Sequence, residues 1–342
     1  MKIEKKILSD SKYHNIINSV SGTELKNFIN SKKKWWLTTS FNKDNHKKIK
    51  EKSNGGVIIN DYSYNENLRI GSAIHCKLLE PNKFKKMFDV YDVDYSDVDL
   101  TNKLPTKYIK LFEERIENSL KSGKSYLLPP EIVNVHRMYD AVKKHLMYNE
   151  TIGDSLKNKL TEFQIILKDI EFHNILEEKI IKYTLKGKLD IVNLFFNEKK
   201  EIKEIKIGDI KTTSKGVAEY TNIYSFDKTH NIHQCLYYEY LVNEYIKANN
   251  GEFAGHKVAD DYVINSYYIV INKQDQDILF MNVIIENKNY NDIKSNIIEM
   301  VNFNKNMLKN HKFSHKEKFY DLTYKKIVNN NFNEVITEED YF

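Results

Sequence analysis

Five β-rich runs occupy the second half of the chain, with helix-like sequence on both sides of them. The runs contain many β-branched and aromatic residues and are separated by charged or turn-forming residues; they cover residues 179–184, 187–196, 202–212, 262–271 and 278–286. Strands that have helices before, between and after them are typical of an α/β or α+β domain with a mixed sheet.

Apolar residues at helical spacing predict the helices around these runs. Ile70, Ile74 and Leu78 recur every four residues, and Pro81 ends the helix that they define. Ser21-Gly22-Thr23-Glu24 is the expected N-cap region of a shorter, earlier helix. Further helices are expected over residues 131–146, 229–248 and 290–308. We expect three parts: a helical lead with a Lys-rich loop (1–60), a core (61–312) and a polar C-terminal tail (313–342).

Charge and cysteine content exclude several classes of protein. The chain has 342 residues, and 53 Lys+Arg against 48 Asp+Glu leave a net charge of +5, which permits a nucleic-acid partner without demanding one. Cys76 and Cys235 are too few for a disulfide framework or an iron–sulfur cluster. No apolar run reaches the length of about 18 residues that indicates a membrane helix, and residues 1–10 lack the apolar stretch of a signal peptide. We therefore expect a cytoplasmic globular protein with no membrane partner.

The segment from Ile205 to Thr213 is the strongest candidate for chemistry. Alternate side chains of a strand share a face, so Asp209 and Lys211 continue an apolar row that begins at Ile205. An isolated charge on a buried face is costly, and such a pair indicates mutual neutralisation, a metal, or both. The tripeptide Asp-x-Lys also occurs at residues 10–12 and 292–294, but only the copy at 209–211 lies on a predicted strand.

Other polar residues support this candidate site only when they are considered together, because each has an ordinary structural interpretation by itself. Asp190 interrupts the neighbouring apolar run, and two carboxylates on adjacent strands are suited to a hard divalent cation such as Mg²⁺. An Asp at a strand start or turn is an equally good interpretation of Asp190 alone. His75 lies beside the apolar face of its helix, where a histidine is more often a core residue than a ligand. Gln234 and Tyr238 are four residues apart, and by themselves they indicate an amphipathic helix face.

In chain order, these residues resemble the PD-(D/E)xK nuclease superfamily, and in detail its RecE-type (exonuclease VIII-like) branch of phages and prophages. The likeness rests on His75, Asp190, Asp209-Ile210-Lys211 and Gln234-x-x-x-Tyr238. It extends beyond them, because residues 71–84 resemble the GTALH…LLEPE.F segment of that branch, and residues 19–36, 123–130 and 208–213 also match. The matched pieces span roughly residues 15–245.

The resemblance implies a restriction-endonuclease-like α/β core, with a mixed central β-sheet flanked by helices and a helical N-terminal part. It implies Mg²⁺ as the cofactor, with Mn²⁺ able to substitute. The implied ligands are His75, Asp190, Asp209 and the backbone carbonyl of Ile210. Members of the family often add a glutamate ahead of the first Asp, for which Glu177 and Glu178 are both candidates. Lys211 would orient the attacking water, while Gln234 and Tyr238 would support the site or contact the DNA backbone.

The implied activity is that of a 5′→3′ exonuclease on linear double-stranded DNA ends. Such enzymes leave 3′ single strands for recombination with an annealing protein, and they work as homo-oligomeric rings in the bacterial host cell. The alternatives are a related endonuclease, a RecB-like single-strand nuclease, and an inactive DNA-binding or assembly protein on the same fold. A candidate DNA-binding stretch is Lys32, Lys33, Lys34, Trp35 and Trp36. No Walker run is present, so we expect no role for ATP.

Overall fold

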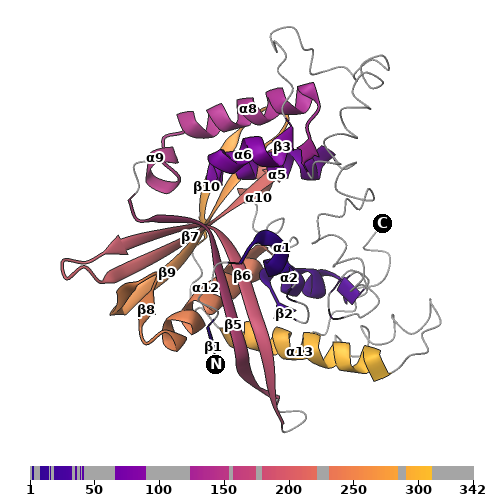
Figure 1. Ribbon diagram of the computed structural model, residues 1–342, viewed down its shortest axis with the longest axis vertical. Helices are drawn as coiled ribbons and strands as arrows, with labels where there is room; N and C mark the ends of the chain where they lie inside the picture. The colour runs from indigo at the N-terminus through magenta and orange to yellow at the C-terminus, as the bar shows by residue number, and fades with distance from the viewer. Residues whose placement is uncertain are drawn as a thin grey trace, which may run out of the picture.

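The fold is known from a computed structural model, shown in Figure 1. It describes residues 2–3, 8–14, 16, 19–32, 35–36, 39, 41, 66–89, 124–153, 157–174, 179–221, 231–283 and 290–309. The expected Lys-rich loop after Phe41, the expected boundaries at residues 60 and 312, and the polar tail at 313–342 lie outside these ranges.

A mixed sheet of eight strands forms the centre of the fold. Its main path runs β1-β5-β6-β7-β9-β10, with β2 added on β6 and β8 on β9. Neighbours on the main path are antiparallel except β7 and β9, which are parallel. The strands are β1 (Lys2–Ile3), β2 (Ser19–Val20), β5 (Lys159–Asn174), β6 (Lys179–Phe196), β7 (Ile202–Thr213), β8 (Glu252–Phe253), β9 (His256–Asn272) and β10 (Ile278–Val283). The predicted fold class, a mixed central sheet flanked by helices, is confirmed. A separate pair joins β3 (Phe88–Asp89) to β4 (Ser125–Tyr126).

Helices cover both faces of this sheet (Figure 1). One layer holds α5, α6, α8 and α9, which pack on Ile191, Ile210 and Tyr267 of the sheet. The other layer holds α2, α12 and α13, which pack on residues such as Leu185 and Ile207. The helices are α1 (Asp10–His14), α2 (Gly22–Asn30), α5 (Glu66–Leu79), α6 (Pro81–Met87), α8 (Pro129–Lys144), α9 (Tyr148–Thr151), α10 (Ala218–Thr221), α12 (Asn231–Ala248) and α13 (Tyr290–Lys309).

Local signals in the sequence explain several helix ends. Ser21 caps α2 as predicted, because its hydroxyl accepts a hydrogen bond from the N–H of Glu24 at 3.2 Å. Pro81 separates α5 from α6 and occupies the first turn of α6, where a missing N–H costs nothing. For the same reason α8 begins at Pro129, two residues before the predicted start at residue 131.

Two strand predictions were wrong. Strand β5 was not predicted at all; its ladder with β6 shifts register between Leu167 and Ile170, and charged residues interrupt its apolar alternation. The two runs predicted at 179–184 and 187–196 are one continuous strand, β6. The strand continues through the apparent gap because Lys186 and Gly187 pair with Ile166 and Ile165 of β5. The Lys186 ammonium also donates to the carbonyl oxygens of Tyr13 and Ile16 at 3.3 and 3.0 Å.

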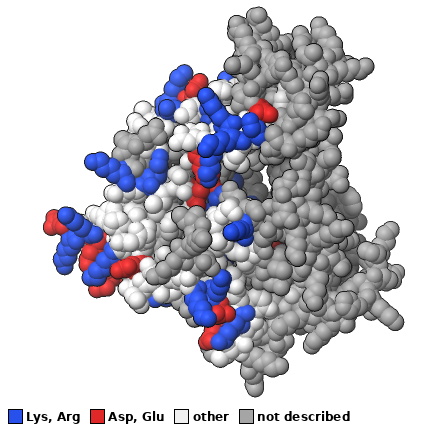
Figure 2. Space-filling model, in the orientation of Figure 1, with Lys and Arg blue, Asp and Glu red and all other residues white. Residues whose placement is uncertain are grey.

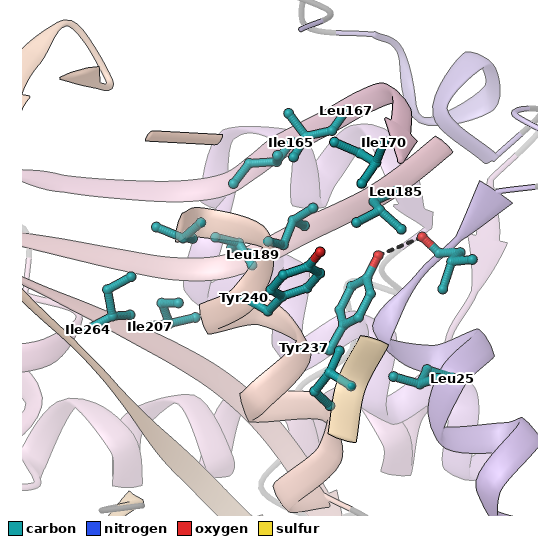
Figure 3. Packing of buried hydrophobic residues seen from close by; sticks show 14 of the residues in the cluster. Leu25, Ile165, Leu167, Ile170, Leu185, Leu189, Ile207, Tyr237, Tyr240 and Ile264 are labelled. Carbon is teal, nitrogen blue, oxygen red and sulfur yellow. Dashed lines mark hydrogen bonds between the residues drawn. The ribbon is translucent and has the colours of Figure 1, made fainter. Parts of the chain in front are cut away.

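A buried tyrosine joins the N-terminal segment to the sheet. The Tyr237 hydroxyl, on α12, donates to the carbonyl of Val20 at 2.6 Å and lies 3.0 Å from the carbonyl oxygen of Lys186 (Figure 3). Its ring is fully buried in the cluster that contains Leu25 and Leu185. This contact fixes α12, which carries Gln234 and Tyr238, against both β2 and β6. Among the described helices, none is both long and apolar enough to cross a membrane.

The glycine before Asp209 gives a test of this packing. A Cβ built on Gly208 would overlap the ring of Tyr267, which is buried and held by the side-chain amide of Asn193 at 3.2 Å. We expect Gly208→Ala to lower the free energy of unfolding by about 1–3 kcal/mol, as overpacked cores do. Urea denaturation measures this change. The control is Gly216→Ala, where a Cβ meets nothing within 4 Å and where we expect no loss. Equal stability of the two variants would contradict the packing described for Tyr267.

Candidate active site

The candidate site lies where two central strands separate. The last antiparallel pair before the separation joins Ile191 of β6 to Gly208 of β7, so the next residues in register are Asp190 and Asp209. Beyond this pair β6 continues on β5, and β7 continues on β9. Backbone groups at such an opening lose their ladder partners and need others. The two predicted carboxylates therefore occupy the first positions after the ladder ends.

The Asp190 carboxylate takes the place of the backbone hydrogen-bond partner that β7 lacks where the ladder ends. Its Oδ2 accepts a hydrogen bond from the N–H of Ile210 at 3.0 Å and lies 2.8 Å from Nε2 of His75. Burial raises the pKa of Asp190, but the charges of His75 and Lys211 and these hydrogen bonds outweigh it, so the net pKa is lowered. Asp190 is thus held as a carboxylate inside the fold.

Helix α5 brings His75 to this opening. The helix approaches β7 closely at Gly71, where an added Cβ would lie 3.1 Å from the hydroxyl of Thr212. His75 then stands between two carboxylates, with Nε2 on Asp190 and Nδ1 at 3.3 Å from Oε1 of Glu162. Burial lowers the pKa of His75, but the attraction of Asp190 and Glu162 is stronger and raises the pKa to about 9. In the metal-free protein His75 is therefore a cation at neutral pH.

Glu162 was not predicted from the sequence. Its neighbours on β5 pair with Ile191 and Leu189, which places Glu162 opposite Asp190. Its φ of 55° is in the left-handed region, a costly conformation that is concentrated at functional sites. The glutamates proposed for this role, Glu177 and Glu178, lie outside the described residues. The alternation of Phe163, Ile165 and Leu167 was the signal that could have revealed β5 and placed Glu162 on its opposite face.

Asp209 and Lys211 form the second half of the site. Lys211 Nζ lies 2.6 Å from Oδ2 of Asp209, and the side-chain amide of Gln234 donates to Oδ1 at 3.4 Å and to the Tyr238 hydroxyl at 3.1 Å. Burial raises the pKa of Asp209, and nearby Asp190 adds to this effect. Burial lowers the pKa of Lys211, but the two aspartates outweigh it and raise the pKa. Lys211 therefore remains an ammonium ion. All the predicted residues of this half are together.

Three residues have the geometry of a cation site. Single ligand atoms of His75, Glu162 and Asp190 all lie within 4.8 Å of one another. Glu162 Oε1 is shielded from solvent, and among the described residues it has the imidazole of His75 beside it but accepts no hydrogen bond of good geometry. Carboxylate oxygens with one imidazole suit Mg²⁺ or Mn²⁺. The residues thus fit a hard divalent cation. Asp209 is not part of this group of three, and its role as a ligand stays a prediction, as does that of the Ile210 carbonyl.

The predicted DNA-binding stretch is in part wrong. Trp35 is 0% exposed; its ring packs on Phe28 and Phe41, and its indole N–H donates to Glu24. A buried ring is not available to stack on a base, so Trp35 is a core residue. Trp36 packs partly buried against the same core. Lys32 is paired with Glu299 of α13 at 2.7 Å. Lys33 and Lys34 lie outside the described residues.

The chain shows only limited similarity to known proteins. No family model matches the chain. A stretch of 69 residues is 44% identical to part of the DNA-directed RNA polymerase subunit beta' of Borreliella afzelii (strain PKo), and it covers 20% of this chain and only 5% of that protein. Among solved structures, a protein of Eubacterium rectale named "Putative exonuclease" aligns over 95% of this chain and 99% of its own, with 12% identity and a TM-score of 0.46. Neither likeness assigns the chain to a family.

The cation site is tested by the thermal stability of the protein. A ligand that binds only the folded state stabilises it by about 2.7 kcal/mol at 100 times its Kd, so Mn²⁺ is expected to raise the Tm of the wild-type protein. Glu162→Gln removes one charged ligand oxygen, so most of this rise in Tm is expected to be lost. Glu171→Gln is the matched control, because Glu171 lies on the same strand in a half-exposed ion pair with Lys182. An equal Mn²⁺ response in all three proteins would remove Glu162 from the site.

Proposed function

We propose that this protein is a metal-dependent deoxyribonuclease that hydrolyses phosphodiester bonds. The observation that best supports this proposal is the arrangement of the charged side chains in the site. Two carboxylates and an imidazole, from Asp190, Glu162 and His75, converge beside an ammonium ion, Lys211, that is held on Asp209. The groups come from β5, β6, β7 and α5, so four separate elements place them together. Hydrolysis of a phosphodiester needs a positioned water and positive charge near the phosphate, and this arrangement suits both needs.

Each residue has a role that follows from its contacts. Asp190, Glu162 and His75 would hold Mg²⁺, or Mn²⁺ in its place, which when bound supplies positive charge to the phosphate and lowers the pKa of a water. Lys211 keeps its proton, so it acts as a charge and a hydrogen-bond donor toward the water or a phosphate oxygen rather than as a base. Gln234 fixes the carboxylate of Asp209, and Tyr238 fixes Gln234. In the reaction the water oxygen would bond to phosphorus as the bond to the leaving deoxyribose oxygen breaks; the water would lose a proton to solvent and the leaving oxygen would take one up.

Surface charge does not by itself identify the substrate. On the face shown in Figure 2, basic and acidic side chains of the described residues lie next to one another in several clusters. They do not form one continuous basic surface there. DNA as the substrate therefore rests on the chemistry of the site and on the ordered motif, not on the charge of this face.

The finer proposal concerns the kind of nuclease. The resemblance to the RecE-type branch implies a 5′→3′ exonuclease that acts on the ends of linear double-stranded DNA and leaves 3′ single strands, although the motif residues themselves do not encode the polarity. A homo-oligomeric ring and a single-strand annealing partner in recombination are part of this proposal, as is a phage or prophage origin in a bacterial cell. They rest on the resemblance of the sequence to the RecE-type branch.

Activity on linear and circular DNA tests the proposal. Linear duplex labelled at the 5′ or the 3′ end, and covalently closed circular DNA, are incubated with the protein and Mg²⁺ or EDTA. We expect loss of linear DNA only, only with Mg²⁺, and early release of the 5′ label. Cutting of circles would indicate an endonuclease. Binding of DNA without any cleavage would indicate an inactive binding protein instead.

Substitutions at the tripeptide test the assignment of residues. We expect Asp209→Asn and Lys211→Met each to lower kcat by about 10²-fold or more, because Lys211→Met removes the positive charge beside the phosphate and Asp209→Asn removes the carboxylate that holds Lys211. The Asp-x-Lys copy at residues 292–294 is a matched control, since Asp292 and Lys294 lie on α13 and not on a central strand. Asp292→Asn and Lys294→Met are expected to leave kcat within a factor of about two. Activity in Asp209→Asn equal to wild type would rule out this site.

A further inference from the structure

Lys188 is a charged residue of the site for which neither the sequence nor the proposed mechanism provides a role. It lies on β6, two residues before Asp190, and its ammonium is paired with Oε2 of Glu162. The side chains of Lys188 and Glu162 are only 22% and 11% exposed. In the β5–β6 ladder Lys188 stands opposite Gln164, so Glu162 is its diagonal neighbour, within reach of a long side chain.

The two oxygens of Glu162 have different surroundings. Oε2 is held by Lys188, whereas Oε1 points to Nδ1 of His75 at 3.3 Å and accepts no hydrogen bond from the described residues. Oε1 is therefore the oxygen that faces the other candidate ligands. The ion pair with Lys188 fixes the rotation of the carboxylate and so decides which oxygen faces the site.

The backbone of Glu162 is also unusual. A left-handed φ of 55° in a strand costs free energy, and it persists only where surrounding contacts hold it. The ladder continues on both sides of Glu162, through Thr161 and Phe163. The side chain is therefore directed by the unusual backbone at one end and by Lys188 at the other.

We propose that Lys188 is a positioning residue of the cation site, which acts by presenting Oε1 of Glu162 to a hard divalent cation. This inference rests on the cation site of the proposed function. Carboxylate ligands of metals are in general hydrogen-bonded by an outer group, and loss of that group typically weakens metal binding 10- to 100-fold. Lys188 does not touch the substrate or the cation in this role.

The same two strands offer a matched control. Lys182 of β6 and Glu171 of β5 form a second cross-strand ion pair, with Nζ 2.9 Å from Oε1. Both side chains are half-exposed or more, at 59% and 50%. Loss of this pair removes the same charges from the same ladder without changing the site.

Isothermal titration of the 342-residue chain with Mn²⁺ alone tests the inference. We expect Lys188→Met to raise the Kd for Mn²⁺ about 10- to 100-fold, Lys188→Arg to stay within about threefold of wild type, and Lys182→Met to have no effect. In a Glu162→Gln background, Lys188→Met is expected to add no further loss, because Lys188 acts through Glu162. Lys188→Gln repeats the test if Lys188→Met does not fold, and the metal-free Tm checks folding of each variant.

The outcomes separate this inference from the proposed function. A wild-type protein that does not bind Mn²⁺ would overturn the cation site itself. A wild-type protein that binds Mn²⁺, with unchanged binding in Lys188→Met, would overturn only the role of Lys188. Tighter binding in Lys188→Met would also overturn it, because it would show that the ammonium competes with the cation. A further loss in the Glu162→Gln background would show that Lys188 does not act through Glu162.

Discussion

The end of the β6–β7 ladder is the constraint on which the rest of the site depends. After the pair of Ile191 and Gly208, strand β6 follows β5 and strand β7 follows β9. The separation exposes backbone groups inside the fold, and the Asp190 carboxylate satisfies one of them at Ile210. It also opens the sheet to both helix layers, so that α5 supplies His75 from one side and α12 supplies Gln234 from the other. A sheet with an unbroken ladder would have no room for these charges.

Charge balance keeps the opening stable. Three carboxylates and several cations lie close together, largely shielded from solvent, and each carboxylate has a cationic partner: Lys188 for Glu162, His75 for Asp190 and Lys211 for Asp209. Unpaired, any of these groups would carry a large desolvation cost. In the metal-free protein the pKa of His75, raised to about 9, lets the imidazole provide positive charge where a bound cation would otherwise do so.

Motif order was a good guide to which residues belong together. His75, Asp190 and Asp209 were predicted as ligands; His75 and Asp190 lie in the group of three with Glu162, and the ligand role of Asp209 stays a prediction. Glu162 escaped prediction because its strand is irregular, with a left-handed residue at Glu162 itself and a register shift between Leu167 and Ile170. Trp35 was misjudged because an aromatic beside lysines has the same appearance in sequence whether it stacks on a ligand or fills a core.

The sequence by itself determined the fold class, several helix ends and the central strands β7, β9 and β10, because these follow from alternation, helical spacing, proline and capping residues that act over a few positions. Only the tertiary structure decided the register that brings Glu162 opposite Asp190, the continuity of β6 through Lys186, and the contact of Lys188 with Glu162. These depend on which strands become neighbours and where their ladders end. Such contacts join residues far apart in the chain, and their energies include burial and charge pairing that no local pattern carries.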